Sequence, residues 1–139
     1  MRLIPIIALI VLLSLPLPAM AQSATPAASS PSAASGDFAG LVDIGGRSLY
    51  LECRGTGSPT VVLVAGGGSS ARYWTDDLLN PDAPRRMVLP GVAESTRVCA
   101  YDRPGTYAEI DGEIVPSRSD AIAQPRTAPE MAEELHALL

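Results

Sequence analysis

The sequence of 139 residues contains no lysine, one histidine and two cysteines, and only 4% of its residues are aromatic. Its positive charge comes from arginine alone, and the formal net charge is −5 at pH 7. Because no stretch is basic, the chain lacks the surface by which proteins bind nucleic acids or anionic membranes. A structural zinc site needs four Cys or His ligands, so we predict no metal site and no cofactor.

The most hydrophobic stretch lies at the start and predicts an export signal over residues 1–21. Arg2 gives a charged beginning, residues 3–17 are largely apolar, and Ala-Met-Ala at 19–21 has the pattern of a cleavage site. The apolar run is shorter than the roughly 20 residues that span a membrane. We therefore expect cleavage, no stable membrane anchor afterwards, and a secreted or periplasmic protein.

The next segment, residues 22–37, consists almost entirely of Ala, Ser, Pro and Gly. Such a composition offers too little apolar surface to offset the entropy lost on ordering. We predict a disordered linker there, followed by one folded domain over residues 38–139.

Four short segments have the composition of β-strands. They are residues 41–44, 47–53, 60–64 and 97–101. The first two flank a Gly-Gly pair and predict a hairpin. The third is apolar on both faces, which is typical of a strand covered on both sides.

Helical signals are confined to two places. Residues 71–92 contain three prolines, which limit them to short helical pieces. After a polar loop over residues 106–126, Thr127 and Glu130 have the spacing of a capping box. The apolar residues Met131, Leu135 and Leu138 then recur with the period of a helix. We predict one amphipathic helix at the C-terminal end.

Taken in this order, the features resemble the N-terminal part of the α/β-hydrolase family. The segments that carry the resemblance are Gly46–Cys53, Pro59–Leu63 running into Gly66–Gly68, Val98–Gly105 and the final Leu135–Leu139. The resemblance covers nearly all of residues 38–139 but only the first part of a family member. It implies an α/β fold with about four strands in a mixed sheet, short helices and one C-terminal helix, forming an incomplete α/β-hydrolase domain.

The family's nucleophile is a serine in a G-x-S-x-G turn, and no such motif occurs in the 139 residues. The nearest approach, residues 67–71, ends in alanine. The family's serine and histidine come later in the chain, so neither His136 nor Asp102 is assigned a catalytic role. We expect Asp102 to pair with Arg103 or its neighbours. The resemblance implies ester or amide substrates, for a truncated chain that is inactive alone.

The resemblance assigns Gly66, Gly67 and Gly68 to the oxyanion-hole loop, with Gly67 at the donor position. Such a loop aims backbone N–H groups at a developing negative charge, and glycine leaves them uncovered. An ordinary glycine turn is the alternative. Trp74 is expected to anchor packing, with a place in an acyl pocket as the weaker possibility.

In the family's sheet the second and fourth strands are antiparallel neighbours, so the resemblance implies a Cys53–Cys99 disulfide. Opposed antiparallel residues lie within disulfide reach, and export favours oxidation; two buried free thiols are the alternative. The same strand order leaves residues 60–64 with an unpaired edge, through which copies of the chain could associate.

Two functions of other classes compete with the hydrolase. The spacing Gly66-x-Gly68-x-x-Ala71 formally fits a dinucleotide-binding fingerprint, although prolines interrupt the helix that should follow. A non-catalytic exported module or binding protein is the other alternative.

Overall fold

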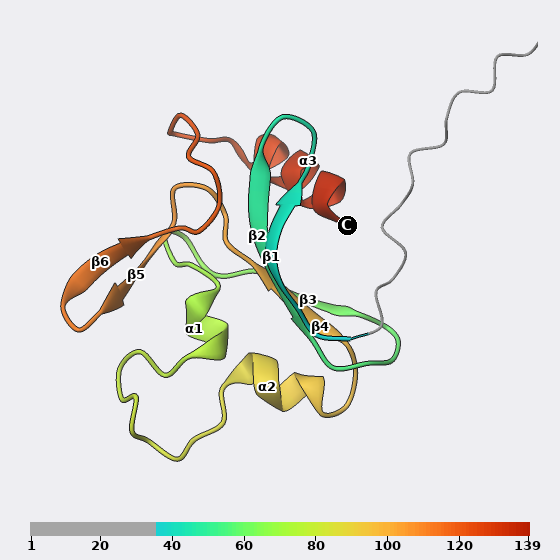
Figure 1. Cartoon of the computed structure of the whole chain (residues 1–139). Helices are drawn as coiled ribbons and strands as arrows, with labels where there is room; N and C mark the ends of the chain where they lie inside the picture. Colours follow the sequence, from blue (N-terminus) through green and yellow to red (C-terminus); the bar gives the residue numbers. More distant parts are fainter. Residues whose placement is uncertain (1–35) are drawn as a thin grey trace, which may run out of the picture. The chain divides into compact units, whose positions relative to one another are not determined.

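The computed structural model describes residues 36–139, so the predicted signal and most of the predicted linker lie outside the described residues. The described strands form a four-stranded sheet, in the order β1-β2-β4-β3, and a separate two-stranded hairpin, β5–β6 (Figure 1). The elements are β1 (Phe38–Asp43), β2 (Ser48–Arg54), β3 (Val61–Leu63), α1 (Arg72–Thr75), α2 (Val88–Ala93), β4 (Val98–Tyr101), β5 (Tyr107–Ile110), β6 (Glu113–Pro116) and α3 (Ala128–Leu138). The predicted mixed α/β class with a C-terminal helix is confirmed.

The sheet combines antiparallel and parallel pairing. β1 pairs antiparallel with β2, and β2 pairs antiparallel with β4. β3 runs parallel to β4 and lies at the end of the sheet order. Its side chains are half-buried, so the full cover on both faces that the sequence suggested is not present in the described part of the chain.

The predicted disulfide between Cys53 and Cys99 is confirmed. The two residues are directly opposed in the β2–β4 register, with their Cα atoms 4.0 Å apart. The bridge joins positions 46 residues apart, and in the chain-entropy account a loop of that length stabilises the fold by about 4 kcal/mol.

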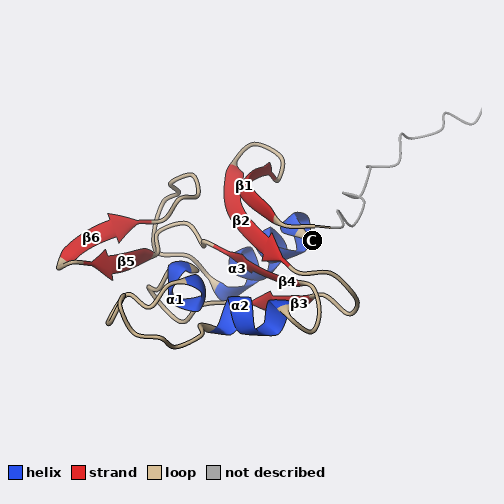
Figure 2. Cartoon of the chain, turned by 60° about the horizontal axis from the view of Figure 1, so that its bottom comes forward, coloured by secondary structure: helices blue, strands red, loops and turns tan. Residues whose placement is uncertain are grey.

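Each face of the sheet has its own apolar cluster, because neighbouring residues of a strand point to opposite faces. Val98 and Ala100 of β4 pack with Ala71 and Leu89 on the face that carries α1 and α2. Tyr101 packs with Leu49 and Leu138 on the face that carries α3. Figure 2 shows the helices on their two sides of the sheet.

The polar loop predicted over residues 106–126 is wrong in its first half, which forms the β5–β6 hairpin. Asp111 and Gly112 make the turn with φ values of 53° and 80°. Asp-Gly between short β-prone runs is a strong signal for this kind of turn. The hairpin therefore forms although the segment is polar.

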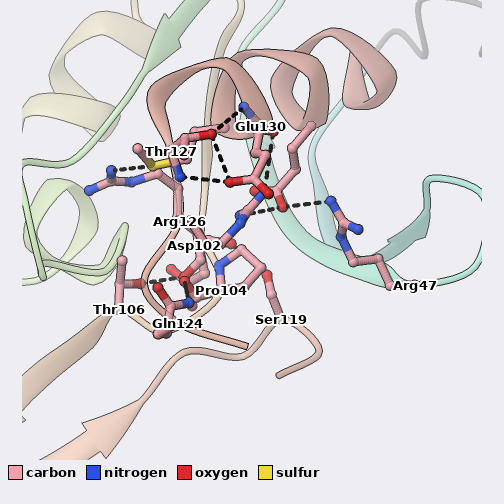
Figure 3. A network of polar contacts seen from close by, with 12 residues as sticks. Arg47, Asp102, Pro104, Thr106, Ser119, Gln124, Arg126, Thr127 and Glu130 are labelled. Carbon is pink, nitrogen blue, oxygen red and sulfur yellow. Dashed lines mark hydrogen bonds and ion pairs between the residues drawn. The ribbon is translucent and has the colours of Figure 1, made fainter. Parts of the chain in front are cut away.

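The C-terminal helix α3 begins as the sequence predicted. The Thr127 side chain accepts a hydrogen bond from the Glu130 N–H, and the Glu130 carboxylate accepts one from the Thr127 N–H at 2.6 Å (Figure 3). This N–H holds the pKa of the Glu130 carboxyl below its usual value. Further along α3, Arg47 and Arg126 both bind one oxygen of the buried Glu134, which fastens α3 to the β1–β2 turn.

Candidate functional site

The glycine-rich turn, residues 65–70, leaves the carboxyl end of β3 and leads into α1. The Ser69 N–H donates to the Gly66 carbonyl at 3.2 Å, which closes the turn. Gly68 has φ +79°, a conformation that favours glycine. A Cβ atom at Gly68 would lie 3.5 Å from the Tyr107 ring.

The turn presents three consecutive backbone donors without partners among the described residues. None of the hydrogen bonds between described residues uses the N–H groups of Gly66, Gly67 or Gly68. Gly66 and Gly67 are exposed, and the space beside their Cα atoms is open. Uncovered N–H groups in succession form a concavity suited to an anion.

Arg103 holds the start of the glycine-rich turn. Its Nη2 donates to the Ala65 carbonyl at 2.9 Å and also to the Gly66 carbonyl. Its Nη1 points to the sulfur of Met131 in α3 at 3.6 Å. The guanidinium is therefore bound to backbone oxygens of the turn and not to a carboxylate.

Asp102 holds the end of the turn. Its fully buried carboxylate accepts the Ala71 N–H at 2.8 Å. It also accepts three hydrogen bonds from Arg118: from the backbone N–H at 3.0 Å, Nε at 2.7 Å and Nη2 at 3.1 Å. Burial raises the pKa of Asp102, but the hydrogen bonds from Arg118 and Ala71 outweigh it and hold that pKa below its usual value.

The expectation that Asp102 pairs with Arg103 or its neighbours is therefore wrong. Arg103 points back to the glycine-rich turn, and the β5–β6 hairpin returns the chain so that Arg118 reaches Asp102. Arg118 is further fixed by stacking on the Tyr50 ring, 3.6 Å from its centroid. The partner lies 16 residues away in the sequence, and it reaches Asp102 only because of the β5–β6 hairpin, which was not predicted.

Tyr107 of β5 lies alongside the turn. Its N–H donates to the Gly68 carbonyl at 2.8 Å, and its carbonyl accepts the Ser70 N–H at 2.9 Å. The side chain is 46% exposed with its ring against Gly68. An aromatic ring therefore lies beside the glycine-rich turn. From the sequence, Trp74 was the aromatic residue considered for a place in an acyl pocket.

The other sequence candidates lie apart from this arrangement. Trp74 is partly buried against the apolar cluster of Ala71, Leu89, Val98 and Ala100, as expected for a packing anchor. His136 is exposed in the last turn of α3 and takes part in no hydrogen bond or ion pair between described residues. Neither Arg103 nor Tyr107 was predicted to belong to the site. Arg103 lies within the segment Val98–Gly105 that carries the family resemblance, and Tyr107 lies two residues after that segment.

The dinucleotide fingerprint finds little support at the turn. A pyrophosphate would need the N–H groups that open the following helix, yet the Ala71 N–H is already bound to a carboxylate. The helix that follows, α1, has only four residues. Within residues 36–139 no cluster of three or more His, Cys, Asp or Glu side chains is placed to hold a metal ion.

A cavity of about 600 Å³ lies between residues 75–90 and the tip of the β5–β6 hairpin, where Asp111 lines it. No residue of the glycine-rich turn borders it. Among the described helices, none has the length and apolar character needed to cross a bilayer.

No family model matches the sequence. Over 104 residues, which make up 72% of the chain, it is 30% identical to a protein of Hormonema carpetanum named probable transporter efuK. The matched stretch is 12% of that protein. The chain thus spans only a small part of this relative, whose name refers to a much longer protein.

Proposed function

We propose that this chain supplies the oxyanion-binding side of an exported serine hydrolase of the α/β-hydrolase type, acting on ester or amide bonds. The attacking serine would lie outside these residues, because the sequence has no G-x-S-x-G motif. The order β1-β2-β4-β3, with the glycine-rich turn directly after β3, supports this proposal. This strand order is the one that the resemblance to the family implies for the second and fourth strands.

The observation that carries the proposal is the set of three free N–H groups in a turn held at both ends. When a carbonyl carbon is attacked, negative charge develops on its oxygen, and fixed donors at that point stabilise the transition state. Arg103 binds the carbonyls of Ala65 and Gly66, at the start of the turn. Asp102 binds the N–H of Ala71, just after the turn. The donors therefore need little reorganisation when the charge appears.

Export of the chain rests on two features. The first is the predicted signal over residues 1–21, and the second is the Cys53–Cys99 disulfide. Stable disulfides are characteristic of oxidising compartments outside the cytosol. Together they support a secreted or periplasmic location.

The proposal is tested by labelling with a fluorophosphonate, which reacts with activated serines. The chain of 139 residues should give no adduct. A chain extended by the residues encoded after Leu139 should contain a G-x-S-x-G serine and give an adduct at that serine. If the continuing sequence has no such motif, or its serine does not react, the proposal is wrong.

A variant of the extended chain then tests the turn itself. Gly67→Pro removes one N–H and should slow labelling by about 10²–10³-fold, the usual effect of deleting an oxyanion donor. Gly67→Ala is the control, because it keeps the N–H, the φ of Gly67 is not positive, and a Cβ atom there meets no other atom within 4 Å. An equal loss in both variants would indicate damage to the fold rather than loss of a donor.

A further inference from the structure

We propose that Arg103 is a positioning residue that orients the N–H groups of Gly66 and Gly67 to receive an anion. This inference rests on the proposed function of the glycine-rich turn and names the side chain that sets its geometry. The contacts from its Nη2 to the carbonyl oxygens of Ala65 and Gly66 are the starting point.

Because the peptide unit is planar, those two contacts also fix the direction of the backbone N–H groups that follow the two carbonyls. In a trans peptide unit the C=O and the following N–H point in opposite directions. The Ala65 carbonyl shares its unit with the Gly66 N–H, and the Gly66 carbonyl shares its unit with the Gly67 N–H. Since one guanidinium nitrogen binds both carbonyls, both N–H groups point away from Arg103, and both glycines are exposed.

The charge of Arg103 strengthens this arrangement. Six other arginines of the described chain form ion pairs, but Arg103 does not. Its full charge is therefore available to the two carbonyls, and charge-assisted hydrogen bonds are stronger than neutral ones. The same charge favours an anion at the turn.

The backbone of Arg103 is fixed as well. Its carbonyl accepts hydrogen bonds from the Thr106 N–H at 3.2 Å and the Thr106 hydroxyl at 2.7 Å, and Thr106 is buried. The guanidinium thus projects from a rigid corner after β4. A group fixed in this way can hold the peptide units of the turn in one orientation.

Anion binding by the full 139-residue chain tests the inference without any nucleophile. Methylphosphonate, a tetrahedral anion, is titrated at constant ionic strength while the amide signals of Gly66 and Gly67 are followed by NMR. The wild-type chain should show saturable shifts of these two signals. Arg103→Gln should weaken the apparent affinity by at least about tenfold, as is typical of partners that orient a binding group.

Arg97→Gln is the matched control. Arg97 also lies outside the ion pairs and also donates to a backbone carbonyl, that of Gly36, at 2.6 Å. It should bind methylphosphonate like the wild type. An equal loss in both variants would show that net charge alone matters and would overturn the inference.

Other outcomes are equally decisive. Wild-type affinity in a folded Arg103→Gln chain, or no saturable shift in the wild-type chain, would overturn the role of Arg103. If Arg103→Gln does not fold, Arg103→Lys decides: reduced affinity supports the inference, and unchanged affinity contradicts it. Failure of fluorophosphonate labelling alone would reject the hydrolase proposal and leave this result standing.

Discussion

Among the carboxylates of the described ion pairs, two have fully buried side chains, one on each face of the four-stranded sheet, and the two are bound very differently. Asp102 follows β4 on the face that carries α1 and α2, and both of its oxygens accept hydrogen bonds. Glu134 of α3 lies on the other face. Its Oε2 accepts from Arg47 at 3.0 Å and Arg126 at 2.7 Å, while Oε1 has no partner among the described residues.

The difference indicates which face must be rigid. A fully satisfied polar group fixes the segments around it, whereas a partly satisfied one leaves a desolvated atom and a weaker constraint. Asp102 joins the end of the glycine-rich turn to the segment after β6. Glu134 only attaches a helix to a surface turn. The better-satisfied carboxylate is the one that supports the proposed site.

The largest effect is expected from Asp102→Ala. The substitution leaves Arg118, whose side chain is only 20% exposed, without its counter-ion, and it frees the buried Ala71 N–H. Breaking a buried pair in this way should lower the free energy of unfolding by about 4 kcal/mol. Urea unfolding of the variant and of Asp76→Ala, which changes an exposed carboxylate, would measure it. Equal losses would contradict the special role of Asp102.

The pH dependence of stability sharpens the same point. The pKa of Asp102 is lowered in the folded chain, whereas an unfolded aspartate has a pKa of about 3.9. The unfolded state therefore takes up protons first, and the contribution of Asp102 is fully present above about pH 4 and is lost as the pH falls through the folded pKa. Asp102→Asn should show a smaller loss of stability between pH 6 and about pH 3 than the wild type. An identical acid response in both would show that Asp102 does not contribute it.

A smaller loss, about 3 kcal/mol, is expected from Glu134→Ala. Only one oxygen of Glu134 is bound, and Arg47 is 32% exposed and can turn to solvent, so most of the cost comes from the nearly buried Arg126. Urea unfolding would measure this loss, with Glu133→Ala on the exposed side of α3 as the control. A loss larger than that of Asp102→Ala would reverse the comparison of the two faces.

Much of this arrangement could be predicted from local sequence signals. The Gly-Gly turn of β1–β2, the apolar strand ending in glycines and the capping box of α3 each act within a few residues, and the structure has all three. The Cys53–Cys99 pairing needed the strand order, which came from the resemblance. The β5–β6 hairpin was missed although Asp111-Gly112 signalled it.

The contacts that define the candidate site could not be predicted in the same way. The bonds from Arg103 to Ala65 and Gly66 span nearly 40 residues, and that from Arg118 to Asp102 depends on the missed hairpin. Arginine side chains are long, and the sequence offers ten of them. Only the folded backbone decides which carbonyl or carboxylate each one reaches.

The smallest effect is expected from a substitution that alters the start of α3 and leaves the ion pairs of that helix in place. Thr127→Ala removes the side-chain acceptor of the capping box and should lower the free energy of unfolding by about 1 kcal/mol, the usual cost of losing such a cap. Because Glu134 lies two turns further along α3, its pairs with Arg47 and Arg126 should remain, and the costs of Thr127→Ala and Glu134→Ala should add in the double variant. Urea unfolding of the three variants measures the sum, with Thr127→Ser as a control that keeps the hydroxyl. A double-variant loss well below the sum would show that the cap and the ion pairs support α3 as one unit, so that the weaker carboxylate depends on the start of its helix.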